Sequence, residues 1–336
     1  MWRHAGIGRY ISELSAALVA LDSGFDFTFL SSVEFERTVL DPAIKTRGAK
    51  VKKAISGIYG ISEQIELPLK AFGADLFHAP HFNVPAFFSG KLVTTIHDLI
   101  YLRDPASLRS GLGRAYAAWI LMIAQKKSSA IISVSESTRA DLLERFPGLS
   151  PEKIFVIPEA ASGRLQRTEN ASTLQATREK FGIRAPFVLF VGSLKPHKNV
   201  EGLVRAMLSV RRDGRMPHEL VLVGRPDPKH PEILNFVQSH PFVKFLGELP
   251  DSELAALYSM ADLFVMPSFY EGFGLPLLEA MSCGVPAIAS DRTSLPEVLG
   301  QAGAFFDPSR VDALSELIYN ILINRDLREK MSKKSL

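Results

Sequence analysis

The sequence is poor in cysteine, in net charge and in long apolar runs, and each absence excludes a class of protein. The single cysteine, Cys283, permits no internal disulfide, which is typical of a reducing compartment. No stretch approaches the about 20 apolar residues that a membrane span needs, and no signal peptide is visible. We therefore expect a cytoplasmic protein.

The charge balance excludes a basic nucleic-acid-binding surface. The net charge is +3, with 18 Lys and Arg against 16 Asp and Glu in residues 1–160 and 21 against 20 in the remainder. Neither half carries a basic tail or stripe, so we expect no nucleic-acid partner.

One local excess of positive charge lies between Asp41 and Glu63, a stretch without an acidic residue. Charge runs of this kind usually mark a solvated loop. The alternative is peripheral contact with anionic lipid headgroups at the inner face of a membrane, where each basic residue contributes about 1 kcal/mol. The run consists of Lys45, Arg47, Lys50, Lys52 and Lys53.

The 336 residues are enough for two domains, and the strand pattern predicts an α/β fold of that kind. After Pro186, helical segments separate the apolar runs FVLFVGS, HELVLVG, FVKFLGE, DLFVMPS, VPAIAS and GAFFDP. Before it, strands are predicted in FDFTFLSS, ADLFHA, KLVTTIHDL, SAIISV and KIFVIPEA. This alternation predicts two doubly wound parallel-sheet domains facing across a cleft, at 1–160 and 186–336, joined by a linker at 161–185.

The richest motif is EGFGLPLLE, residues 271–279, which follows an apolar strand. Gly272 and Gly274 let the backbone approach a ligand, and Pro276 suits the first turn of a helix. A helix N-terminus attracts phosphate, while Glu271 and Glu279 can accept hydrogen bonds from paired sugar hydroxyls. The pattern favours a sugar nucleotide; the alternative is a helix cap at Glu271 and a solvated Glu279.

Two lysines in GSLKPHKNV point to the same ligand. Lys195 and Lys198 lie at or just before a predicted helix N-terminus, where the helix dipole disfavours positive charge. We therefore expect Lys198 to bind the diphosphate of the donor. The alternative is a surface lysine paired with Glu201 or another acidic residue.

Several residues of the first half are weaker candidates. His97 ends the strand KLVTTIHDL, at the edge where open α/β sheets bind ligands, so it can contact a sugar hydroxyl or a developing charge; a purely structural histidine is the alternative. His78 and His81 are expected to be structural. Gly6 and Gly8 open a predicted helix, either as a phosphate-binding loop or for close packing.

Taken together, several segments resemble the retaining GT-B glycosyltransferases of family 4. They are EGFGLPLLEA with its Glu-x7-Glu pair, VGSLKPHKN, TTIHDLIYLRDP, GIGRY and IASDRTSLPEVLGQAGAFFDP. The resemblance is greatest to the mannosyltransferases that build bacterial O-antigen and other surface polysaccharides. It implies two Rossmann-like domains, the C-terminal one holding the donor and the N-terminal one the acceptor.

The resemblance also implies a reaction and roles for residues. A hexose, most simply mannose from GDP-mannose with a UDP-sugar as the alternative, moves with retention to a growing glycan or a lipid-linked acceptor. No cofactor and no metal are implied, in agreement with the absence of Asp-x-Asp. His97, Glu271 and Lys198 are the implied catalytic residues, at the anomeric centre, the transferred sugar and the diphosphate. The implied substrate-binding residues are Gly6, Gly8, Ser193, Lys195, Gly272, Phe273, Gly274, Leu275 and, on the ribose, Glu279.

The sequence departs from the family in three places. Ser193 stands where many members have a diphosphate-binding arginine, so Lys195 or His197 is expected to compensate. We expect the first strand before Gly6 and the final helix that crosses back to the first domain to be missing, which predicts a truncated sequence. A non-catalytic homologue that binds a sugar nucleotide or a partner enzyme is the competing hypothesis. A dehydrogenase lacks its glycine fingerprint here, whereas a sugar-nucleotide epimerase is compatible with the fold.

Overall fold

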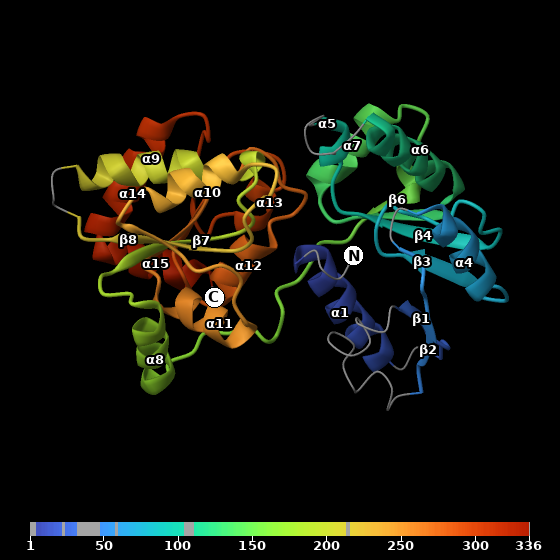
Figure 1. The fold of residues 1–336 in the computed structure, drawn as a ribbon, viewed down its shortest axis with the longest axis horizontal. Coiled ribbons are helices and arrows are strands. Elements are labelled where there is room, and N and C mark those ends of the chain that lie inside the picture. The colour runs from blue at the N-terminus through green and yellow to red at the C-terminus, as the bar shows by residue number, and fades with distance from the viewer. Residues whose placement is uncertain are drawn as a thin grey trace. The chain divides into compact units, whose positions relative to one another are not determined.

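The computed structural model describes residues 5–21, 24–31, 48–57, 60–103, 111–212 and 216–335. The chain divides into two compact units, Met1–Glu159 and Ala160–Leu336 (Figure 1). Every strand pairing within the described residues is parallel. The predicted α/β fold with parallel sheets is therefore confirmed.

The N-terminal unit contains two parallel sheets. A four-stranded sheet has the order β3-β4-β5-β6, and β1 pairs with β2 in a separate ribbon. The described elements are α1 (Ala5–Ala20), β1 (Thr28–Ser31), β2 (Lys50–Lys53), α4 (Ile61–Lys70), β3 (Leu76–Ala79), β4 (Lys91–Ile96), α5 (Ile100–Arg103), α6 (Gly111–Lys127), β5 (Ala130–Ser133), α7 (Glu136–Arg145) and β6 (Ile154–Val156).

The start of α1 differs from the expected glycine loop. Gly6 and Gly8 already lie inside the helix, which the structure describes from Ala5 onwards. Gly6 is exposed and Gly8 is buried, so close packing, the second of the two interpretations, fits Gly8 better than a phosphate-binding loop. Farther along α1, Ile11 and Val19 belong to a small apolar cluster with Phe29 of β1.

The C-terminal unit has one six-stranded sheet in the order β12-β11-β10-β7-β8-β9. This is the Rossmann order, which reverses between β7 and β10. The described elements are α8 (Ala171–Phe181), β7 (Phe187–Val191), α9 (Val200–Arg211), β8 (Glu219–Val223), α10 (Pro231–Gln238), β9 (Val243–Phe245), α11 (Asp251–Met260), β10 (Leu263–Met266), α12 (Leu275–Ser282), β11 (Ala287–Ser290), α13 (Leu295–Leu299), β12 (Ala304–Phe306), α14 (Val311–Ile323) and α15 (Arg325–Ser335).

The central strands of this sheet are buried on both faces. Val188 and Phe190 of β7 enter one core cluster, while Phe187 and Leu189 enter the other. Successive side chains of a strand point to opposite faces, so the continuous apolar runs seen in the sequence supply both cores. The segment 160–185 packs against the same unit through the buried side chains of Leu165 and Ile183.

A tight backbone contact fixes the ends of β7 and β8. Gly224 has φ +144°, and a Cβ added there would lie 2.0 Å from the carbonyl oxygen of Gly192. The Gly192 N–H in turn donates to the Val223 carbonyl at 2.9 Å. Only glycine fits position 224, and the loop that follows β7 is positioned by this contact.

We expect Gly224→Ala to lower the free energy of unfolding by about 2 kcal/mol or more, because the new methyl group clashes with backbone that cannot give way. Urea denaturation measures the effect. Gly163→Ala is the matched control, since a Cβ at Gly163 meets nothing within 4 Å. Equal stability of the two variants would contradict the tight contact.

Candidate active site

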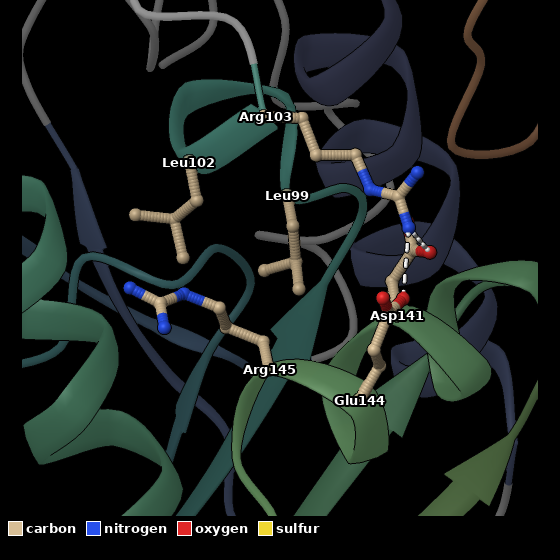
Figure 2. Close-up of a pocket in the computed structure, with 6 residues that line it drawn as sticks. All are labelled: Leu99, Leu102, Arg103, Asp141, Glu144 and Arg145. Atoms are coloured by element: carbon tan, nitrogen blue, oxygen red, sulfur yellow. Dashed lines mark hydrogen bonds and ion pairs between the residues drawn. The ribbon is translucent and has the colours of Figure 1, made fainter.

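A hollow of about 280 Å³ lies in the N-terminal unit between α5 and α7 (Figure 2). Three of its charged residues pair with one another, because the Arg103 guanidinium is turned toward Asp141 and Glu144 and forms ion pairs with both. None of the residues predicted from the sequence lines it. The hollow is lined by Leu99, Leu102, Arg103, Asp141, Glu144 and Arg145.

The predicted donor-site residues gather at the carboxyl ends of β7 and β10 in the C-terminal unit. These two strands are paired neighbours, and the strand order reverses between them. In open α/β sheets, ligands bind at such a switch point because the two following loops separate there. One loop leads from β7 to α9 and the other from β10 to α12.

A short ion pair joins the two loops. Lys198 Nζ lies 2.6 Å from Glu271 Oε1 and 2.7 Å from Oε2, and the side chains are only 17% and 9% exposed. A backbone bond runs beside it, from the Phe269 N–H to the His197 carbonyl at 2.8 Å. Lys198 therefore pairs with an acidic residue, as the alternative interpretation allowed, but the partner is Glu271 and the pair is largely buried rather than on the surface.

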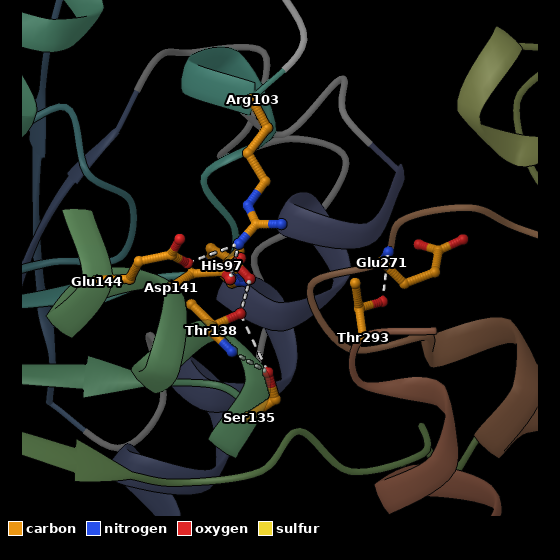
Figure 3. Close-up of polar contacts among 8 residues, drawn as sticks. All are labelled: His97, Arg103, Ser135, Thr138, Asp141, Glu144, Glu271 and Thr293. Atoms are coloured by element: carbon orange, nitrogen blue, oxygen red, sulfur yellow. Dashed lines mark hydrogen bonds and ion pairs between the residues drawn. The ribbon is translucent and has the colours of Figure 1, made fainter. Parts of the chain in front are cut away.

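The Glu271 side chain and backbone are held by hydroxyl groups. Ser268 Oγ donates to Glu271 Oε1 at 2.6 Å, and the Glu271 N–H donates to Thr293 Oγ1 at 3.0 Å (Figure 3). The buried Ser294 Oγ lies within hydrogen-bond distance of the carbonyls of Glu271 and Phe273, at 3.1 and 2.8 Å. These three hydroxyl residues have no role in the sequence analysis, although Thr293 and Ser294 belong to a segment that carries the family resemblance.

The glycine turn before α12 forms as the sequence predicted. Gly274 is the N-cap residue with φ +108°, and a Cβ there would lie 2.7 Å from Leu295 Cδ2. The helix begins at Leu275 with Pro276 in its first turn. Pro276 has no N–H, and the Leu277 N–H donates to the Gly274 carbonyl at 2.9 Å. The positive end of the helix dipole and the N–H groups that precede Pro276 are therefore what this turn offers to an anion.

Glu279 lies one turn farther along α12 and is buried. The hydroxyl of Tyr258, a fully buried residue of α11, donates to Glu279 Oε2 at 3.1 Å. The alternative of a solvated surface residue is therefore wrong for Glu279. Tyr258 is a further residue that the sequence analysis missed, since it lies in a helix without a motif.

The turn after β7 contains two predicted ligands and a neutral histidine. Ser193 is half-buried, while Lys195 is exposed and precedes the short 3-10 helix Pro196–Lys198. Burial, together with the charges of Lys198 and Lys195, lowers the pKa of His197 to about 3. His197 is thus neutral near pH 7, so Lys195 is the better candidate to compensate for the missing arginine.

In the N-terminal unit, both ring nitrogens of His97 face acceptors. Nδ1 lies 2.8 Å from Glu159 Oε1, and Nε2 lies 3.0 Å from the Pro80 carbonyl oxygen. A carbonyl only accepts, so Nε2 carries a proton, and Nδ1 carries a second proton when the Glu159 carboxylate is ionised, because an ionised carboxylate also only accepts. Burial lowers the pKa of His97, but the hydrogen bond and charge of Glu159, the Pro80 carbonyl and the charge of Asp98 together raise it above its ordinary value.

Aromatic and hydroxyl groups surround this histidine. The Tyr10 ring meets the His97 ring edge-on with centroids 4.7 Å apart, and its hydroxyl lies 3.0 Å from Thr95 Oγ1. His78 Nε2 lies 2.9 Å from the same Thr95 oxygen. Thr138 Oγ1 donates to the His97 carbonyl at 3.1 Å (Figure 3).

The two other histidines of the sequence analysis have structural surroundings. Burial and the charge of His97 lower the pKa of His78 to about 4, so His78 is neutral near pH 7. His81 is buried and packs against the Phe82 ring with centroids 4.1 Å apart.

Profiles of two glycosyltransferase families match the chain. The one described as "Glycosyltransferase Family 4" matches residues 4–161, and the one described as "Glycosyl transferases group 1" matches residues 175–335. The O-antigen chain mannosyltransferase B of Escherichia coli is 33% identical over 264 residues, which cover 78% of this chain and 68% of that protein. The chain belongs to glycosyltransferase family 4.

Other relatives agree with this assignment. The serotype-specific mannosyltransferase WbdA of Escherichia coli is 30% identical over 270 residues, 76% of this chain but 32% of that protein. Among solved structures, HepE of Anabaena with UDP and glucose has a TM-score of 0.77 at 19% identity, covering 98% of this chain and 90% of that one. WaaG, a glycosyltransferase of lipopolysaccharide biosynthesis, has a TM-score of 0.72 at 20% identity with the same coverage. The GT-B fold expected from the sequence is confirmed.

We expect Glu159→Gln to lower the pKa of His97 below the ordinary histidine value, because burial then acts without the opposing carboxylate. An NMR titration of the ring protons measures it, with the exposed Glu152→Gln as control. The raised pKa of His97 stabilises the wild type in full below the unfolded-state value of about 6.5, and this contribution is lost as pH rises through the folded-state pKa. The stability gap between wild type and Glu159→Gln should therefore narrow on going from pH 6 to pH 9. An unchanged pKa of His97 would contradict the pairing.

Proposed function

We propose that this family 4 glycosyltransferase moves mannose from GDP-mannose to a growing glycan or lipid-linked acceptor, with retention as in its family. The main support is the ion pair between Lys198 and Glu271 beside the N-terminus of α12. It places a cation that can bind phosphate next to a carboxylate that can accept hydrogen bonds from sugar hydroxyls. The choice of mannose comes from the names of the relatives that are about 30% identical. A UDP-sugar is the second candidate donor, since the similar HepE structure contains UDP and glucose.

Lys198 and α12 act on the leaving group in this proposal. Departure of the nucleoside diphosphate builds negative charge on the phosphate that the sugar leaves. Lys198 and the amides of Gly272–Leu275 meet that charge, and because Glu271 already holds Lys198 in place, little reorganisation is needed.

The ion pair need not break when a donor binds. An ammonium group has three N–H donors, and two of them suffice for the two oxygens of Glu271. The third can donate to a phosphate oxygen. The remaining lone pairs of the Glu271 carboxylate then accept from hydroxyls of the transferred sugar, while Glu279 accepts from the ribose.

His97 is proposed to act through its charge and position. While both nitrogens are protonated, the ring has no lone pair with which to remove a proton, so the imidazolium form does not act as a general base. A fixed imidazolium can instead stabilise negative charge or donate to a sugar oxygen after exchanging one of its partners.

A non-catalytic binder of sugar nucleotides is the second candidate function. Ser193 favours it, because the position lacks the arginine of many family members.

A thermal-shift panel of GDP, UDP, ADP and their sugars, followed by a transfer assay with several acceptors, distinguishes the transferase from the non-catalytic binder. A nucleotide at 100 times its dissociation constant adds ~2.7 kcal/mol of stability. We expect the largest shift with GDP compounds and product from GDP-mannose. A shift without product supports the binder, and no shift with any nucleotide contradicts both.

Variants of the ion pair test the assigned roles. Lys198→Ala should lower kcat by about 10²- to 10³-fold and weaken nucleotide binding, because it removes a donor to the leaving group. Glu271→Gln should abolish transfer but keep or strengthen nucleoside diphosphate binding, because Lys198 no longer shares its charge. Calorimetric titration with GDP and a transfer assay measure both effects. Glu201→Gln, on the helix after Lys198, is the matched control and should behave as wild type. Loss of GDP binding in Glu271→Gln with transfer retained in Lys198→Ala would reverse the assignment.

A further inference from the structure

Helix α4 has the reverse of the usual polarity. Its buried residues are Glu63 and Gln64, which are 5% and 3% exposed. The opposite is true of three apolar residues spaced four apart on one face of the helix. Ile61 is 81% exposed, Ile65 56% and Leu69 71%. A helix on a protein surface normally buries its apolar face, so this orientation needs a cause.

The buried polar side of α4 is tied into the unit by hydrogen bonds. Asn83 Nδ2 donates to Glu63 Oε2 at 2.7 Å. Gln64 Oε1 accepts from the Ala86 N–H at 2.6 Å, and Gln64 Nε2 donates to the Tyr116 hydroxyl at 3.2 Å. Rotation of α4 to bury its isoleucines would leave these groups unpaired, so the apolar face stays outward.

Just beyond the helix, Phe72 extends the apolar face and is 89% exposed. Large apolar side chains gathered on one exposed face typically mark a binding surface.

The charges around this apolar face are mainly positive. Residues 48–76 contain four lysines, at 50, 52, 53 and 70, and three acidic residues. Of the acidic residues, Glu63 is buried, and Glu66 forms an ion pair with Lys70 at 2.7 Å that cancels both charges. Lys50, Lys52 and Lys53 therefore remain against Asp75. Lys52 Nζ donates to the Lys70 carbonyl at 3.0 Å, so the lysines of β2 lie against the end of α4.

We propose that these residues form a lipid-docking face that binds the surface of an anionic membrane. It consists of Ile61, Ile65, Leu69 and Phe72 with Lys50, Lys52 and Lys53. The apolar side chains enter the boundary between headgroups and acyl chains, and the lysines contact the anionic headgroups.

Charge favours a lipid surface over a second copy of the chain. A two-fold symmetric dimer through this face would place the same lysines opposite one another. The contact is peripheral in character, since none of the helices in the described part of the chain is long and apolar enough to cross a bilayer. Lys45 and Arg47, which the sequence analysis assigned to the same contact, lie outside the described residues.

Vesicle flotation with the full chain tests the proposal. We expect binding to vesicles of phosphatidylcholine with about one third phosphatidylglycerol, weaker binding at high salt, and little binding to phosphatidylcholine alone. The double variant Lys50→Glu with Lys53→Glu should weaken partitioning at least about tenfold. Ile65→Asn with Leu69→Asn should do the same through lost apolar contact.

Matched controls separate this face from general effects of charge and apolarity. Ile323 of α14 is 57% exposed, nearly the same as Ile65, so Ile323→Asn should leave vesicle binding unchanged. Lys333→Glu with Lys334→Glu makes the same charge change on exposed residues of α15. The proposal is overturned if the control variants lose as much vesicle binding as the variants of the face, or if the wild type does not bind anionic vesicles. Sedimentation velocity tests the alternative that a second copy of the chain binds this face. A dimer in the wild type that the double variant Ile65→Asn with Leu69→Asn converts to monomer would also overturn the proposal. The assay needs no sugar nucleotide, so its outcome is independent of the transfer assay.

Discussion

The C-terminal site depends on the ion pair between Lys198 and Glu271. Two loops from neighbouring strands each carry one charge into a largely buried position, where either charge alone would be costly to desolvate. Together with the backbone bond from Phe269 to His197, the pair holds the turn after β7 against the turn before α12. A cation, a carboxylate and a helix N-terminus thus share one small region, as a phosphate attached to a sugar requires.

The N-terminal unit uses the same geometry with different residues. His97 follows β4 and Glu159 follows β6, two strands of one parallel sheet whose carboxyl ends lie at the same edge. The carboxylate orients the ring and raises the pKa of His97. In each unit, a basic side chain that follows one strand pairs with an acidic side chain that follows another strand of the same sheet, so the strand order decides which residues meet.

The proposed lipid-docking face would hold the protein at the membrane surface. A transferase that acts on a lipid-linked acceptor gains from residing at the membrane, because the acceptor is concentrated there. The reversed polarity of α4 allows this contact without unfolding. Glu63 and Gln64 form hydrogen bonds inside the unit, while the isoleucines remain exposed.

Local patterns in the sequence were enough to predict the α/β fold and the helix that begins after Gly274, and they singled out Glu271 and Lys198, which the structure joins in one ion pair. These features follow from the spacing of apolar residues and from glycine and proline chemistry, which act over a few residues. The sequence could not reveal that Lys198 binds Glu271, 73 residues away, or that Glu159 holds His97. It also suggested a glycine loop where α1 is already helical, and it contained the period-four isoleucines of α4 without showing which face is buried. Those outcomes depend on the strand order and on which face of a helix is buried against the rest of the unit, so only the tertiary structure decided them.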